Sequence, residues 1–204
     1  MNTLLLTGFE PFLDHPLNPS AEIVKELDGM IIGDYIVKGC LLPVEFSQSA
    51  NQMISLFDEV KPDVVISLGL AAGRNTITPE RIAINCNDGV KDNSGFIPED
   101  EAIIQEGPVG YFSTLPIRTF VNVLREYGYP AEISNSAGTY LCNNVMYQML
   151  HYISVNQYNC LSGFVHIPAS HDLAVISKRT MPSWSHADLV EACKVMIQSL
   201  AVEK

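Results

Sequence analysis

A cysteine at the start of an expected helix is the first candidate for chemistry in this chain. Cys142 lies in residues 138–144, which we expect to lead from a strand into a helix. The partial positive charge at a helix N-terminus favours the thiolate over the thiol, and the thiolate is the nucleophilic form. Position alone leaves two interpretations open for Cys142, a nucleophile or a core cysteine in the first turn of the helix.

A thiolate nucleophile needs a neighbouring base, and of the five histidines in the sequence, His166 is the best placed. His166 follows an apolar run that begins at Gly163, so we expect it to emerge at the carboxyl edge of a sheet, where open α/β folds bind their ligands. A histidine with a purely structural role is the competing interpretation. A metal site that joins His166 to His171 and Asp172 matches no standard zinc spacing.

An acid that orients the imidazole would complete a cysteine–histidine site, because a carboxylate fixes the tautomer and stabilises the imidazolium. Glu80 follows the expected strand that ends at Gly69. Spacing alone leaves a second interpretation for Glu80, a solvated loop acid paired with Arg81. The sequence lacks the GxSxG, GxxxxGK[ST], GxGxxG and HExxH patterns of other chemistries.

The elements that must position these residues alternate along the chain. Apolar and β-branched residues predict short buried strands at residues 3–7, 64–68, 131–134 and 163–167. Apolar spacings of three and four predict helices at residues 46–60, 117–127 and 142–154. Capping residues predict the starts of two more helices, one at Asn18-Pro19-Ser20 and one at Ser185. This order predicts an α/β fold, a three-layer α/β/α sandwich with a central twisted, mostly parallel sheet, in one domain over residues 1–204.

Residues 87–111 break the alternation. They are rich in turn formers and acids and show little periodicity. We expect a long surface excursion, which in compact domains is typically a functional loop or hairpin, or else a mobile segment.

Composition limits the classes of partner. Twelve Lys and Arg against twenty-three Asp and Glu give a net charge of -11, which repels phosphate backbones and anionic lipid headgroups, so we expect neither a nucleic-acid nor a membrane partner. The opening MNTLLLTGFEPF lacks the features of a signal peptide. The five cysteines are odd in number and form no CxxC pair, which favours a reducing compartment over a disulfide framework. We therefore expect a soluble cytoplasmic protein.

Six segments, in order, resemble the pyroglutamyl peptidase I (pyrrolidone-carboxylate peptidase) family, cysteine peptidase family C15. They are TGFEPF at 7–12, NPS at 18–20, LPV at 42–44, the Glu80 segment at 69–85, SAGTYLCN at 136–143 and GFVHIP at 163–168. The resemblance implies an α/β/α sandwich, a cytoplasmic location, commonly a homotetramer, and a cysteine peptidase that removes N-terminal pyroglutamate from peptides and proteins. We expect no cofactor and no metal.

The resemblance also implies roles for the three residues raised above. The family's nucleophile falls on Cys142, its general base and acid on His166, and its carboxylate on Glu80. The expected reaction is amide hydrolysis by acyl transfer through a thioester.

The family's pyroglutamate pocket is lined by aromatic residues that fall here on Phe9, Phe12 and Tyr140. Read without the resemblance, Phe9 and Phe12 are either core residues or a platform for a ring. From their location, Asn18 or main-chain groups near Leu70 are candidates to hydrogen-bond the lactam.

Two departures from the family pattern concern substrate contact. Leu70 and Ala72 stand where family members usually have glutamine and glycine, and residues 88–93 are one residue shorter and lack the usual arginine. Lys91 supplies a charge there but no planar guanidinium. We expect these changes to affect substrate orientation and oxyanion support, not the catalytic residues. Two alternatives stay open, a non-catalytic binding homologue that retains the fold and a hydrolase of another small cyclic amide.

Overall fold

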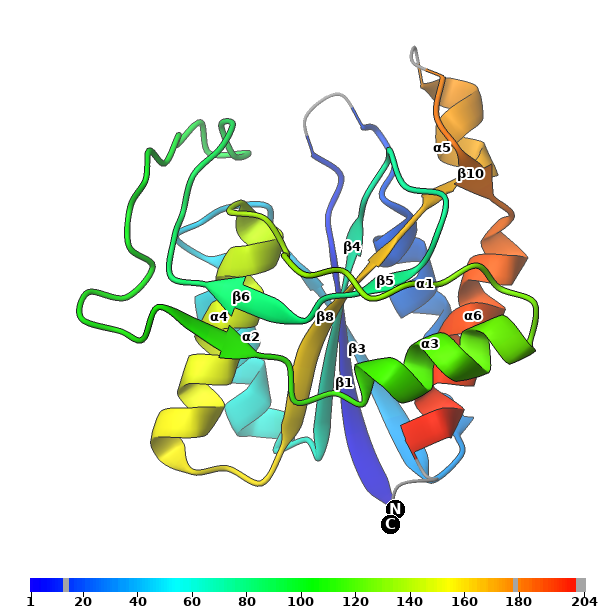
Figure 1. Cartoon of the computed structure of the whole chain (residues 1–204), viewed down its shortest axis with the longest axis horizontal. Coiled ribbons are helices and arrows are strands. Elements are labelled where there is room, and N and C mark those ends of the chain that lie inside the picture. Colours follow the sequence, from blue (N-terminus) through cyan, green and yellow to red (C-terminus); the bar gives the residue numbers. More distant parts are fainter. Residues whose placement is uncertain (13–14, 178–179, 201–204) are drawn as a thin grey trace.

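A six-stranded sheet with the order β2-β3-β1-β4-β8-β5 forms the middle layer of the computed structural model, which describes residues 1–12, 15–177 and 180–200 (Figure 1). Its four inner strands are parallel, β1 (Asn2–Phe9), β3 (Tyr35–Leu42), β4 (Val64–Leu70) and β8 (Leu161–Ile167). The edge strands β2 (Ile31–Ile32) and β5 (Thr78–Pro79) run antiparallel to their neighbours. The sheet is therefore mixed and mostly parallel, as predicted.

Helices cover both faces of this sheet, which explains why its central strands β1, β4 and β8 are largely apolar and buried. Helices α1 (Pro19–Leu27), α3 (Ile117–Glu126) and α6 (His186–Ser199) share one hydrophobic core with Leu4 and Leu6 of β1. Helices α2 (Ser49–Val60) and α4 (Leu141–Asn156) share the other core with Leu5. The two groups lie on opposite sides of the sheet in Figure 1. The predicted three-layer α/β/α sandwich is confirmed.

The helix starts follow from local capping. Asn18 accepts a hydrogen bond from the Ser20 N–H, and Pro19 takes the first position of α1, where its missing N–H costs nothing. At the start of α6, the Ser185 hydroxyl accepts from the Asp188 N–H. Both predicted starts are confirmed. By contrast, α2 begins at Ser49, so Phe46, the first residue of the predicted stripe, precedes the helix.

The strand predicted at residues 131–134 is wrong. Ala131 and Ser134 form only isolated bridges, to Ile77 and Glu80. Backbone hydrogen bonds flank the gap, from Glu132 N to the Ile77 carbonyl and from Ser134 N to the Pro79 carbonyl. Between them the ladder needs an N–H at position 79, which proline lacks. Pro79 thus reduces a strand to two bridges.

The remaining elements are short. They are β6 (Ile82–Ile84), β7 (Gly110–Phe112), β9 (Ala169–Ser170), β10 (Ser183–Trp184) and α5 (His171–Ile176). The β6–β7 pair closes off the irregular excursion between residues 85 and 109, which was predicted as residues 87–111. Within the described ranges, no helix has the length and apolar character to cross a bilayer.

Candidate active site

The carboxyl ends of β1, β4 and β8 and the first turn of α4 meet at one edge of the sheet (Figure 1). His166 on β8 is in register with Gly69 on β4. A Cβ atom at Gly69 would lie 3.1 Å from the Cys142 Sγ and 2.6 Å from the Phe164 ring. The glycine that ends the apolar run of β4 therefore leaves the space in which the Cys142 sulfur sits beside His166.

Glu80 and His166 form a buried pair. The Glu80 Oε1 lies 2.7 Å from the His166 Nδ1, and the two residues are 0% and 7% exposed. Strand β5 places Glu80, because Thr78 is in register with His166 and the Glu80 N–H donates to the Phe164 carbonyl over 2.9 Å. With Nδ1 engaged by Glu80, Nε2 is the ring nitrogen that remains to serve Cys142, whose charge acts on His166.

The charges of this group support one another. Burial by itself lowers the pKa of His166, but the neighbouring Cys142 and Glu80 more than offset it and raise the pKa to about 9. Burial raises the pKa of Glu80, but its hydrogen bond with His166, the His166 charge and its hydrogen bond with Arg74 bring the pKa below the usual value. At neutral pH the site therefore holds an imidazolium beside an ionised carboxylate.

Arg74, not Arg81, is the cation beside Glu80. The Arg74 Nη1 lies 2.8 Å from the Glu80 Oε1, whereas the Arg81 Nε donates to the Asn135 side chain. The interpretation of Glu80 as a solvated acid paired with Arg81 is wrong, because the carboxylate is fully buried. Sequence reasoning missed the Arg74 contact, since the five residues between Arg74 and Glu80 show no periodicity that predicts their meeting.

An apolar recess of about 280 Å³, part of it open to solvent, adjoins Cys142. All five residues predicted for substrate contact line it, namely Phe9, Phe12, Asn18, Leu70 and Tyr140. Cys142 also lines it, as do Val44 and Leu141, which were not predicted to contact the substrate. The Phe12 and Tyr140 rings are stacked with their centroids 6.3 Å apart. Phe9 is buried, so it belongs to the core as well as to the recess. Phe12 is partly exposed and lies at the rim of the recess.

Asn18 has other partners. Its side chain accepts from the Ser20 backbone and hydroxyl and donates to the Glu10 carbonyl over 3.2 Å. The Asn18 amide thus joins the start of α1 to the end of β1. Asn18 was predicted to hydrogen-bond the lactam, and both polar atoms of its side chain already have partners within the fold.

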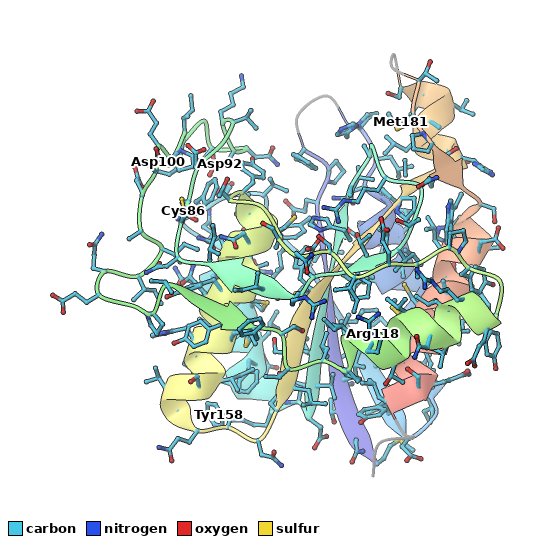
Figure 2. The ribbon with its side chains drawn as sticks, viewed as in Figure 1. Cys86, Asp92, Asp100, Arg118, Tyr158 and Met181 are labelled. Carbon is cyan, nitrogen blue, oxygen red and sulfur yellow. The ribbon has the colours of Figure 1, made fainter. Side chains whose placement is uncertain are left out.

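A buried carboxylate that sequence reasoning missed shapes the irregular excursion. Asp92 accepts backbone hydrogen bonds from Phe46, Ser94 and Phe96 over 2.9–3.0 Å and is only 5% exposed. Burial raises its pKa, but the hydrogen bond from the Ser94 hydroxyl, together with these backbone bonds, brings the pKa below the usual value. Figure 2 shows Asp92 and Asp100 in this excursion, on the opposite side of the molecule from Arg118.

The same loop is fastened to three segments that line the recess. Asn93 donates from its backbone to the Val44 carbonyl and from its side chain to the Pro11 carbonyl, and the Tyr140 hydroxyl donates to the Lys91 carbonyl. The loop with the missing arginine is therefore hydrogen-bonded to segments that line the recess, although none of its own residues does. The Lys91 side chain itself is exposed.

The other histidine considered with His166 lies in a different environment. His171 Nδ1 is 2.9 Å from the Ser183 hydroxyl, whereas His166 meets Glu80 and Cys142. In the described part of the chain, no group of three or more histidine, cysteine, aspartate or glutamate residues is arranged to hold a metal ion.

A cysteine at a helix N-terminus, a buried histidine and a buried carboxylate beside an apolar recess define the class of cysteine hydrolases. The family model described as pyroglutamyl peptidase matches residues 2–203, and the chain belongs to this family. The resemblance noted in the sequence is thereby confirmed.

Relatives and solved structures agree. The pyrrolidone-carboxylate peptidase of Oceanobacillus iheyensis is 52% identical over 200 residues, which are 98% of this chain and 100% of the relative. A mutant pyrrolidone carboxyl peptidase from Pyrococcus furiosus superposes with a TM-score of 0.95 at 43% identity, covering 98% of this chain and 99% of that one. The crystal structure of Bacillus amyloliquefaciens pyroglutamyl peptidase I gives a TM-score of 0.95 at 35% identity and covers 100% of this chain and 98% of that one.

Proposed function

We propose that this chain is a cysteine peptidase that hydrolyses the amide bond after an N-terminal pyroglutamyl residue of peptides. The observation that carries the proposal is the meeting of Cys142, His166 and Glu80 beside an apolar recess, in a chain that belongs to the pyroglutamyl peptidase family.

In the first half of the reaction, the Cys142 thiolate attacks the carbonyl that joins the pyroglutamyl ring to the next residue. The His166 imidazolium, held by Glu80, gives its proton to the departing amine, which leaves a pyroglutamyl thioester on Cys142. Backbone N–H groups in the first turn of α4 are the candidate donors to the oxyanion, because the Tyr140 hydroxyl at the N-cap is directed to the Lys91 carbonyl instead.

In the second half, neutral His166 takes a proton from water, and the resulting hydroxide attacks the thioester. The carbon–sulfur bond breaks, pyroglutamate leaves, and the Cys142 thiolate and the His166 imidazolium are restored. Both halves need His166 at one position with one nitrogen facing Cys142, which the hydrogen bond from Nδ1 to Glu80 provides.

The recess explains the choice of substrate. A pyroglutamyl residue is a neutral ring without an α-ammonium group, so it enters a site lined by Phe9, Phe12, Leu70 and Tyr140 without leaving a charge unpaired. Glutamyl or glutaminyl residues carry an ammonium that would lose its hydration there. The recess therefore favours the cyclised residue over its open forms.

The proposal extends to location and assembly. We expect the protein to act in the cytoplasm as a homotetramer, as the family resemblance implies. The five cysteines, all present as free thiols, are consistent with a reducing compartment. Light scattering on purified protein is expected to give a mass of four chains, and a monomer mass at working concentration would contradict this part of the proposal.

The test is hydrolysis of a fluorogenic pyroglutamyl amide beside the matched glutamyl, glutaminyl and prolyl amides, with the wild type, Cys142→Ala and the matched control Cys193→Ala. We expect cleavage of the pyroglutamyl amide alone, its loss in Cys142→Ala and its retention in Cys193→Ala. A folded wild type that cleaves none of the four would favour a binding homologue or a hydrolase of another cyclic amide.

A further inference from the structure

A single oxygen of Glu80 holds two partners. Its Oε1 lies 2.7 Å from the His166 Nδ1 and 2.8 Å from the Arg74 Nη1. The Glu80 side chain is fully buried, whereas the Arg74 side chain is 36% exposed. Of the residues that the structure describes, Arg74 is the only permanently charged cation in ion-pair contact with this carboxylate.

Both the backbone and the side chain of Arg74 are linked to the strand that carries His166. The Arg74 N–H donates to the Ala71 carbonyl, and the Ala71 N–H donates to the Ile167 carbonyl of β8, each over 2.9 Å. The Arg74 guanidinium also donates to the Thr78 hydroxyl, and Thr78 is in register with His166. The guanidinium is thus anchored to the same strand as the imidazole that Glu80 orients.

The proposed reaction changes the charge of His166 but not that of Arg74. When His166 has given its proton to the departing amine, Glu80 faces a neutral ring, and a buried carboxylate without a counter-charge is costly. A guanidinium keeps its charge at every pH at which proteins are folded. Arg74 can therefore compensate Glu80 in both protonation states of His166.

We infer that Arg74 is a positioning residue of this site, whose positive charge keeps Glu80 ionised and its Oε1 turned toward His166 throughout the reaction. The inference rests on the proposed function. Arg74 does not line the recess and acts only through Glu80. Its loss is therefore expected to affect turnover and not substrate binding.

Three substitutions test this. Arg74→Gln removes the charge, Arg74→Lys keeps it, and Arg81→Gln is the matched control, because Arg81 adjoins Glu80 in sequence but contacts Asn135. We expect Arg74→Gln to lower kcat about tenfold to hundredfold, the loss typical of a residue that orients a functional side chain, with KM changed less than about twofold. Arg74→Lys is expected to restore kcat to within about threefold of the wild type, and Arg81→Gln to match the wild type.

A second readout needs no substrate. The rate of Cys142 alkylation by iodoacetamide, followed against pH, reports the thiolate in the presence of His166. Removal of a positive charge raises the pKa of the neighbouring groups His166 and Glu80, so Arg74→Gln is expected to move the alkylation profile to higher pH. An Arg74 charge that does not act on His166 through Glu80 would leave the profile in place. Arg74→Met provides a second neutral variant should the glutamine variant fail to fold.

Action through Glu80 is tested by a double-mutant cycle. In the Glu80→Gln background, Arg74→Gln is expected to lower kcat by less than about threefold, because the partner of the guanidinium is gone. The inference is overturned if a folded neutral variant keeps the wild-type kcat and alkylation profile, if Arg74→Lys is as impaired as Arg74→Gln, or if the loss is equal in both backgrounds. A wild type that cleaves no pyroglutamyl amide would refute the proposed function instead, and the alkylation readout would still decide the role of Arg74.

Discussion

At the scale of single residues, the site depends on a histidine that is buried and still charged. Burial opposes the imidazolium, and His166 keeps it because Cys142 and Glu80 lie against it. Glu80 in turn stays ionised in a fully buried position because His166 and Arg74 share its Oε1. Each charge is therefore tolerable only in the presence of the others, and removal of one changes the protonation of the rest.

This coupling gives a signed prediction for pH. The imidazolium is lost as pH rises through the His166 pKa of about 9, so kcat/KM is expected to fall on an alkaline limb in that region. Glu80→Gln removes a negative charge that raises the pKa of His166, and the limb is expected to move to lower pH with a reduced plateau. The pH profiles of both proteins with the pyroglutamyl amide provide the measurement. An alkaline limb that Glu80→Gln leaves unmoved would contradict the coupling.

Position raised Cys142, His166 and Glu80 as candidates before the fold was known, because each follows an expected strand or begins an expected helix, and the family resemblance implied their roles. Arg74 and Asp92 were not predicted to contribute. Both lie in irregular segments, where no period relates a residue to its neighbours in space, and their partners Glu80 and Phe46 are brought to them by the surrounding chain. Contacts between loops depend on tertiary geometry that local sequence patterns do not encode.

At the scale of elements, strands and loops bring these residues together. The alternation of apolar runs and amphipathic stretches was sufficient to predict the layers and four of the five main helices close to their observed bounds, because that signal is long and periodic. It failed at the strand expected over residues 131–134, where Pro79 breaks the ladder. It also missed the inner strand β3, whose apolar run is interrupted by Lys38 and Gly39, and the edge strands, which are two residues long and give no period.

The close approach of β4 to α4 yields a prediction at Gly69. A methyl group there would meet the Phe164 ring at 2.6 Å and approach the Cys142 sulfur, so Gly69→Ala is expected to lower kcat and to destabilise the fold by about 1–3 kcal/mol through overpacking. Gly73→Ala is the matched control, because no atom lies within 4 Å of its added Cβ. Denaturant unfolding and steady-state kinetics on both variants test this. Equal stability and kcat in the two would show that the space at Gly69 is not required.

The loop around Asp92 yields a prediction about substrate binding. Asp92→Ala leaves the Phe46, Ser94 and Phe96 N–H groups without their acceptor, which is expected to cost about 1–3 kcal/mol and to loosen one wall of the recess. KM is expected to rise more than kcat falls, because the loop is hydrogen-bonded to Val44 and Tyr140 of the recess and not to His166. Glu99→Ala, an exposed position in the same excursion, is expected to behave as the wild type in steady-state kinetics. A selective loss of kcat in Asp92→Ala would refute this role.

At the scale of the whole molecule, residues far apart in the chain meet at one edge of one sheet. Phe9, Glu80, Cys142 and His166 come from the first, middle and last thirds of the sequence, and the parallel order of the inner strands places them on the same side. The net charge of -11 lies on a molecule whose recess is apolar. Selection of a neutral cyclic residue therefore belongs to the local site, and the surface charge serves solubility.

Covalent labelling with a pyroglutamyl chloromethyl ketone, whose chloride is displaced by an attacking thiolate, tests the proposed site most directly. We expect one adduct per chain, on Cys142, with activity lost in proportion to labelling and no adduct from the matched glutamyl compound. Peptide mass spectrometry locates the adduct among the five cysteines. An adduct on Cys40, Cys86, Cys160 or Cys193, or full activity in a chain labelled at Cys142, would contradict the proposed site.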